Sequence, residues 1–287
     1  MGKGVEATKR LKPPPLIIPA TVVAKAIAHS RSLPYPTPSN TSPESALLGT
    51  LISNAYCSFA SIQYLLWRRN DPFVVLIFPD PNILLREHER AYKEALNKLR
   101  QLPPLTIRRT EQRGSSSSGA TPISVEPISL YKVIEDRLFG EERCIGIVPP
   151  KPAVANTYKG YLISAKPDLV QINEFREVSK AIELKLIREE FIEYAKIQAQ
   201  LYSYVYNCTT DLCIIQLAYH SSSSSSSRGE KNKGIASMHP PSSMPVDVIN
   251  ILRIANITSS MISNALPSLD TVMPFYQEYK EQTYGIP

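Results

Sequence analysis

The stretch that decides the fold begins as Tyr161-Leu-Ile-Ser-Ala-Lys-Pro-Asp168 and ends, one strand later, with Glu183-Leu184-Lys185. Apolar and β-branched residues dominate both 161–172 and 178–187, a composition typical of strands. The polar residues 173–177 between them indicate a turn. Two strands joined by a short turn pair antiparallel, so the sequence predicts a hairpin here.

The register of this hairpin decides which side chains meet. A turn centred after Phe175 places Asp168 directly opposite Glu183, with their β-carbons about 4.5–5.5 Å apart. Because side chains alternate along a strand, Glu183 and Lys185 share one face. Two facing carboxylates repel each other, and Lys185 or a divalent cation would offset that repulsion. A surface strand pair with a Glu–Lys ion pair is the alternative that needs no function.

At these residues the chain resembles the PD-(D/E)XK nuclease superfamily, and more closely its RecB-like branch. The resemblance implies an α/β fold, a mixed central sheet flanked by helices with a restriction-endonuclease-like core and a helical N-terminal part. It also implies Mg²⁺ or Mn²⁺ bound by Asp168, Glu183 and the Leu184 carbonyl. Lys185 would then orient or activate the attacking water.

The RecB-like branch carries Gln-x-x-x-Tyr on the helix after the Glu-x-Lys strand. Residues 188–206 are predicted as that helix and contain two overlapping matches, Gln198 with Tyr202 and Gln200 with Tyr204. Gln198 and Tyr202 fall on the apolar stripe at helical spacing, so we select them as the inward pair. They would position substrate and support Lys185.

Residues 82–100 form a second predicted helix, with Asn82 as N-cap. His88 lies on its apolar stripe, where a polar side chain needs a partner. The RecB-like branch places a metal-binding histidine on such a helix, and the resemblance therefore implies that His88 is a metal ligand. A hydrogen-bonded core histidine is the alternative. Glu87 and Glu89 fall off the stripe and are expected to be solvated.

A third predicted helix begins after Ser42 and carries Cys57. It resembles the entry helix of the CRISPR-associated adaptation exonucleases, whose iron–sulfur cluster uses such a cysteine together with three near the C-terminus. The other cysteines here are Cys144, Cys208 and Cys213, and closely spaced cysteines are absent. We therefore expect no cluster, zinc site or disulfide framework. A buried Cys57 and a reducing, cytoplasmic location follow.

Composition favours a globular protein with a polyanionic partner. The chain of 287 residues is 43% hydrophobic and has a formal net charge of +6. That charge is compatible with binding DNA, which we expect to have single-stranded ends, and protein partners in a DNA-processing complex would suit the same role. No apolar run is expected to reach the roughly 18 residues that cross a bilayer, so no membrane partner is predicted.

Changes in composition suggest four consecutive segments along the chain. Prolines and serine tracts mark the predicted extended or flexible parts. The segments are a proline-rich extended N-terminus (1–43), a RecB-like nuclease domain with a flexible loop near 111–122 (44–220), a serine-rich linker (221–239) and a C-terminal helical segment packing on the core (240–287). A strand at 212–219 is predicted within the second segment, and a helix at 246–266 within the fourth.

The leading hypothesis is a metal-dependent DNA nuclease, with exonuclease action favoured over endonuclease action. A nucleic-acid-binding or structural protein with a catalytically silent nuclease fold is the alternative. Ala165, where the family often has glycine, and the missing cluster cysteines motivate it. A third hypothesis is an enzyme that acts on a phosphate compound or uses a metal but does not cleave nucleic acid.

Overall fold

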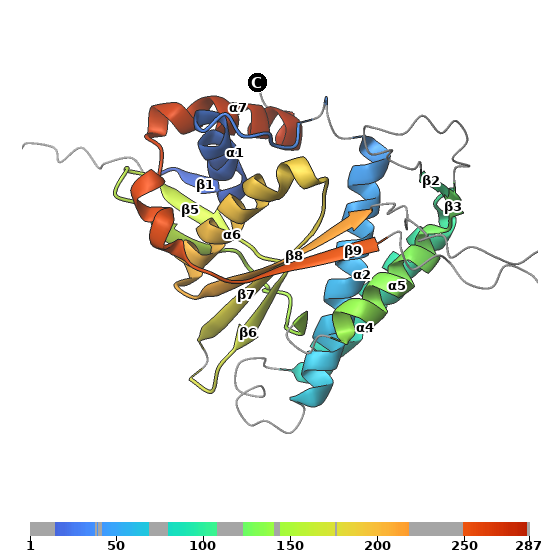
Figure 1. Ribbon diagram of the computed structural model, residues 1–287. Helices are drawn as coiled ribbons and strands as arrows, with labels where there is room; N and C mark the ends of the chain where they lie inside the picture. Colours follow the sequence, from blue (N-terminus) through green and yellow to red (C-terminus); the bar gives the residue numbers. More distant parts are fainter. Residues whose placement is uncertain are drawn as a thin grey trace, which may run out of the picture.

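The computed structural model describes residues 15–37, 39, 42–68, 80–107, 123–140, 144–175, 177–217 and 249–285. These residues form a three-layer α/β arrangement, as predicted for the fold class (Figure 1). One face of the largest sheet packs on helices α2, α4 and α5, and the other packs on α6.

The largest sheet has the strand order β6-β7-β8-β9. Strand β7 (Val178–Leu186) pairs antiparallel with β6 (Leu169–Ile172) and parallel with β8 (Thr209–Leu217). The parallel connection runs through a short 3₁₀ turn and α6 (Ile192–Tyr206), which confirms the predicted helix. Strand β8 confirms the strand predicted at 212–219 as far as residue 217. Residues 218–219 lie outside the described part.

The single strand predicted over 161–172 is wrong. It divides into β5 (Leu162–Ala165) and β6, which belong to different sheets. The break falls at Pro167, which has no N–H to donate to a sheet ladder. Strand β5 instead lies between β1 (Ile17–Pro19) and β4 (Ala153–Asn156) in a second, mixed sheet. A two-stranded ribbon of β2 (Leu105–Ile107) and β3 (Ile123–Val125) stands apart.

Three helices that each begin with a proline pack on the first face: α2 (Pro43–Trp67), α4 (Pro81–Gln101) and α5 (Pro127–Phe139). Ser42 caps α2 as predicted, its hydroxyl accepting the Ser45 N–H at 3.1 Å. Asp80, not the predicted Asn82, caps α4, because its carboxylate accepts two backbone N–H groups of the first turn.

Helix α2 is long and apolar enough, by length and composition alone, to cross a membrane. Half of its apolar window is buried inside the protein. Its buried residues join the core with α4, α5 and the sheet.

The N-terminal region is also more ordered than predicted. Within the segment expected to be extended, residues 17–30 form β1 and the buried helix α1 (Ala20–Ser30). Pro19 stands at the N-cap of α1. Alanine, valine and isoleucine side chains of α1 pack against α6 and the C-terminal helix α7 (Leu269–Tyr284). The proline run at 13–15 begins outside the described residues.

The helix predicted at 246–266 is wrong. Residues Ile249–Ile257 form β9, followed by two 3₁₀ turns, and the helix is α7. Four isoleucines in β9 favour a strand, since β-branched side chains fit a pleated surface. The C-terminal region thus supplies a strand of the largest sheet. The loop near 111–122 and the linker at 221–239 lie outside the described residues.

Candidate active site

The predicted pairing of the two carboxylates is confirmed by the strand register. Leu169 pairs with Ile182, and the same register carried one residue further places Asp168 opposite Glu183. The Asp168 backbone N–H donates to Glu183 Oε2 at 3.2 Å. In return, the Leu184 N–H donates to Asp168 Oδ2 at 2.8 Å. These bonds hold the two carboxyl groups side by side at the start of β6.

Glu183 is the centre of the polar cluster. Its side chain is buried, yet Oε1 is 2.5 Å from the Lys185 ammonium. From α6, the Gln198 amide and the Tyr202 hydroxyl each donate to Oε1 at 3.4 Å. Gln198 also donates to the Tyr202 hydroxyl at 2.5 Å. The structure therefore brings all five predicted residues, Asp168 included, to one place.

The choice between the two Gln-x-x-x-Tyr matches is also confirmed. Gln198 and Tyr202 are buried, whereas Gln200 and Tyr204 are only partly buried. The Tyr204 hydroxyl turns away to the Asn156 carbonyl, to which it donates at 2.9 Å. Helical phase alone was sufficient for this prediction.

Burial and neighbouring charges together shift the pKa values of Glu183 and Lys185. Burial, and then the neighbouring Asp168, raise the pKa of Glu183 to about 7 despite the opposing effect of Lys185. Burial lowers the pKa of Lys185, but the Glu183 and Asp168 carboxylates outweigh it and the net pKa is raised. Lys185 is therefore a cation at neutral pH. The raised pKa of Glu183 means that this cation only partly offsets the burial of Glu183 and the charge of Asp168.

Helix α2 supplies contacts that the sequence analysis missed. The Ser53 hydroxyl donates to Asp168 Oδ1 at 3.2 Å and lies 3.8 Å from the Cys57 sulfur. Cys57 is buried, as predicted, and its pKa is raised by burial and then by Asp168. Ser53 and Cys57 are four residues apart and share one helix face. The i, i+4 spacing could have predicted that Ser53 and Cys57 share a helix face. It could not have predicted that this face lies against Asp168, because the two segments are distant in the sequence.

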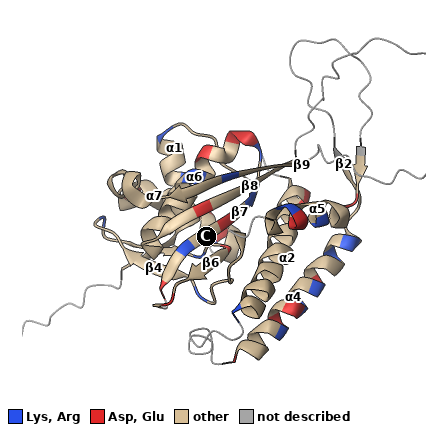
Figure 2. Cartoon of the chain, turned by 60° about the horizontal axis from the view of Figure 1, so that its bottom comes forward, with Lys and Arg blue, Asp and Glu red and all other residues tan. Residues whose placement is uncertain are grey.

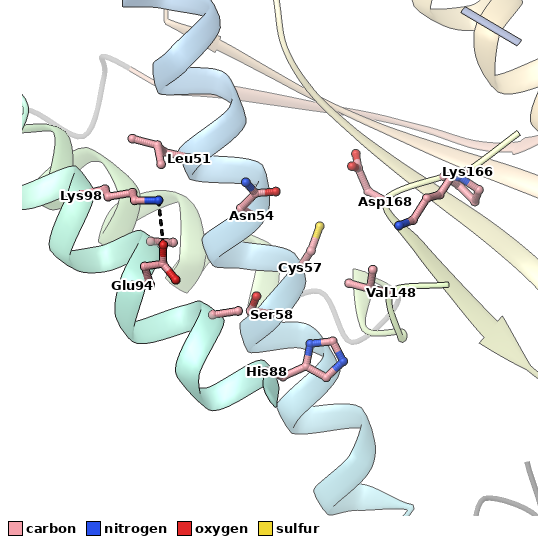
Figure 3. Close-up of a pocket in the computed structure, with 13 residues that line it drawn as sticks. Leu51, Asn54, Cys57, Ser58, His88, Glu94, Lys98, Val148, Lys166 and Asp168 are labelled. Carbon is pink, nitrogen blue, oxygen red and sulfur yellow. Dashed lines mark ion pairs between the residues drawn. The ribbon is translucent and has the colours of Figure 1, made fainter. Parts of the chain in front are cut away.

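A cavity of about 460 Å³ opens beside Asp168 (Figure 3). Helix α2 contributes Asn54, Cys57 and Ser58 to its lining, and α4 contributes His88 among others. Lys166 and Asp168 lie on the side opposite α4 (Figure 3). The candidate carboxylate thus faces a space large enough for a small ligand.

His88 lines this cavity but stands apart from the carboxylates. Its Nε2 atom is buried without a hydrogen-bond partner among the described residues. Burial lowers the pKa of His88 in spite of the nearby Glu87, so the ring is neutral at neutral pH. In the described part of the chain, no three His, Cys, Asp or Glu side chains are close enough together to hold a metal ion. His88, Asp168 and Glu183 are thus not gathered into such a group in this structure, and their joint binding of a metal stays a prediction.

The charged residues of α4 lie mainly outside the cavity. Segments coloured for acidic and for basic residues follow one another along the ribbon of this helix (Figure 2). Glu87 and Glu89 are exposed there, as predicted. Glu94 and Lys98 border the cavity and form an ion pair at 2.7 Å.

Two of the four cysteines lie together in the core. Cys144 and Cys213 meet in the core with their sulfurs 3.3 Å apart, although 69 positions separate them in sequence. Cys57 lies instead at the cavity, and Cys208 is partly buried after α6. Wide spacing in the sequence therefore did not prevent Cys144 and Cys213 from meeting in the fold.

A second buried charge cluster is centred on Asp211, which pairs with Ile182, the residue next to Glu183, in the register of β7 and β8. Asp211 on β8 is fully buried and accepts hydrogen bonds from Arg253, from Lys180 at 3.1 Å and from the Asn256 backbone N–H at 2.9 Å. Burial raises the pKa of Asp211, but Arg253, Asn256 and Lys180 together lower it below its ordinary value. Strong pairing of this kind is structural, because it leaves the carboxylate little capacity for a ligand.

These features define an α/β protein with a polar cluster buried between β7 and α6 and open to a cavity at Asp168. Comparisons of the chain with protein families, curated proteins and solved structures find no match.

Proposed function

We propose that the protein is a metal-dependent DNA nuclease with a restriction-endonuclease-like core. The observation that carries the proposal is the convergence of Asp168, Lys185, Gln198 and Tyr202 on the buried Glu183 carboxylate. Their order, an Asp before one strand, Glu-x-Lys on the next and Gln-x-x-x-Tyr on the following helix, resembles the RecB-like branch. A plain surface ion pair would need neither the burial nor the helix contacts.

The residues present fit a hard divalent cation. Mg²⁺ is commonly bound by one or two carboxylates together with water and substrate phosphate, and Asp168 and Glu183 provide such a pair. The raised pKa of Glu183 indicates that added positive charge would stabilise the ionised pair. Mg²⁺ or Mn²⁺ held there, with the Leu184 carbonyl as a further oxygen, would stabilise the charge that develops on a scissile phosphate.

The protein side chains would orient the attacking water and hold the two carboxylates in place. Lys185, protonated at neutral pH, would orient the attacking water as a hydrogen-bond donor and a positive charge rather than as a base. Gln198 and Tyr202 hold Glu183 Oε1, while Ser53 and the Leu184 N–H hold the Asp168 carboxylate. Both carboxylates are thus fixed in direction before a substrate arrives.

The test is cleavage of labelled single- and double-stranded DNA in Mg²⁺, Mn²⁺ or EDTA. Lys185→Ala should lower the metal-dependent rate by about 100-fold or more with an unchanged circular dichroism spectrum. Lys196→Ala is the matched control, because Lys196 lies on the outer side of α6 in an ion pair with Glu193. Full activity of Lys185→Ala refutes the assignment. DNA binding without products would instead favour the catalytically silent alternative.

A further inference from the structure

Two thiols that the proposed active site does not use meet in the core. Cys144 and Cys213 are both fully buried, and their sulfur atoms are 3.3 Å apart. Because a disulfide bond is about 2.05 Å long, the two sulfurs would have to approach each other by roughly 1.2 Å to be joined. Rotation of the two side chains can supply a movement of this size.

We propose that Cys144 and Cys213 form a redox couple that closes to an intramolecular disulfide in an oxidising thiol–disulfide buffer and opens in a reducing one. The inference does not depend on the proposed nuclease function. It concerns one link between two residues, which the wide spacing of the cysteines in the sequence does not indicate.

The oxidant is a small-molecule disulfide, such as glutathione disulfide. The thiolate of one cysteine attacks a glutathione sulfur, forms a mixed disulfide and releases one glutathione thiol. The thiolate of the other cysteine then attacks the protein sulfur of the mixed disulfide and releases the second glutathione. The two cysteine thiols lose two electrons and two protons, and one glutathione disulfide becomes two molecules of glutathione.

The backbone beside each cysteine is held by hydrogen bonds of the largest sheet. Cys213 lies within β8, where it pairs with Leu184 of β7. Shortly after Cys144, Ile147 exchanges two backbone hydrogen bonds with Val170 of β6, at 2.9 and 2.8 Å. Folding itself therefore brings the two thiols together, which raises their effective concentration relative to each other.

The link would enclose the whole candidate site. The two cysteines are 69 positions apart, and the residues between them include Asp168, Glu183, Lys185, Gln198 and Tyr202. A link across a loop of this length restricts the unfolded chain and so favours the folded one. The oxidised protein should therefore be the more stable form. By the same linkage, the folded protein should retain the disulfide more strongly than the unfolded chain does.

Burial should make the reaction slow. Hydrogen bonding to Cys144 and then burial raise the pKa of the Cys213 thiol, so the thiolate that attacks a disulfide is scarce in the closed fold. The oxidant also has to reach two sulfurs that have no exposed surface. Oxidation should therefore proceed through local opening and become faster at urea concentrations below the unfolding transition.

The test uses the full chain with Cys57→Ala and Cys208→Ala, which leaves Cys144 and Cys213 as its only cysteines. This double variant is equilibrated in glutathione buffers of rising disulfide fraction, quenched with acid, unfolded and alkylated. Mass spectrometry then counts the free thiols, and peptide mapping locates the link. Cys144→Ala and Cys213→Ala in the same background are the matched controls. The wild type is mapped in parallel, so the result does not depend on how well a variant folds.

Oxidation should join positions 144 and 213 within one chain, in the wild type and in the double variant. It should raise the Tm of the double variant by about 5 °C or more, a rise that neither control shows. Relative to the chain unfolded in urea, the folded protein should become oxidised at a ratio of glutathione disulfide to squared glutathione concentration that is about 100-fold lower.

The inference is overturned if both thiols stay unlinked at equilibrium in the most oxidising buffer, or if they pair with other cysteines instead. It is equally overturned if the link forms without raising the Tm. Cys144 and Cys213 would then be small apolar side chains of the core. None of these results bears on the nuclease assignment, and a failure to cleave DNA leaves the redox couple standing.

Discussion

Glu183 should make the metal-free protein less stable as the pH rises. The residue is 2% exposed, and burial followed by the Asp168 charge raises the pKa of its carboxyl group from the ordinary 4.5 to about 7. Because the folded-state pKa exceeds the unfolded value, the stabilising contribution is fully present below pH 4.5 and is lost as the pH rises through 7.

The size of this loss follows from the shift. Each unit of pKa corresponds to about 1.4 kcal/mol, so the rise from 4.5 to about 7 corresponds to about 3 kcal/mol in the free energy of unfolding. Integrating the proton linkage between pH 5 and pH 8 gives about 2.5 kcal/mol of that total. For a chain of this length the corresponding change in Tm is about 5 °C.

The assay is urea and thermal unfolding in EDTA from pH 5 to pH 8, with Glu183→Gln as the comparison. Glutamine does not titrate, and all other ionisable groups are common to both proteins. The stability of the wild type should fall by about 2.5 kcal/mol relative to Glu183→Gln over this range. Added Mg²⁺ at pH 8 should raise the Tm of the wild type and not that of the variant. Parallel pH profiles, or a relative gain in wild-type stability with rising pH, would refute the reasoning.

Two further predictions concern buried polar groups. Gln198→Ala should cost about 1–3 kcal/mol in urea unfolding, because Tyr202 and Glu183 lose a buried partner. Gln200→Ala should stay within about 0.5 kcal/mol, and equal losses would contradict the assigned helix phase. Asp211→Ala should cost about 3–5 kcal/mol by leaving Arg253 and Lys180 without their carboxylate. Because the pKa of Asp211 is lowered, its contribution should disappear as the pH falls through that folded-state value, and Asp211→Asn should lack this acid loss.

The sequence predicted those parts of the site that follow from local periodicity. Side chains alternate strictly along a strand, so a turn centre was enough to place Asp168 opposite Glu183. The helical period likewise selected Gln198 and Tyr202 over the overlapping pair. Both depend on residues close together in the chain.

Apolar runs that suit two kinds of structure were harder to interpret. The apolar spacing of β9 suits either a helix or a strand, although its isoleucines favour a strand, and β9 pairs antiparallel with β8 in the structure. Within the proline-rich N-terminal segment, residues 20–30 form the buried helix α1 because α6 and α7 cover it. Propensity is a weak guide when packing against distant elements supplies most of the stability.

By itself, then, the sequence determined the α/β class, the hairpin register and the inward face of α6. Only the tertiary structure decided that Pro167 sends β5 to another sheet, that Ser53 reaches Asp168, and that His88 lines the cavity apart from the carboxylates. The physical reason is the distance along the chain over which each feature is determined. Strand alternation and helical phase are set by covalent geometry within a few residues, whereas these contacts depend on how α2 and α4 pack against the sheet.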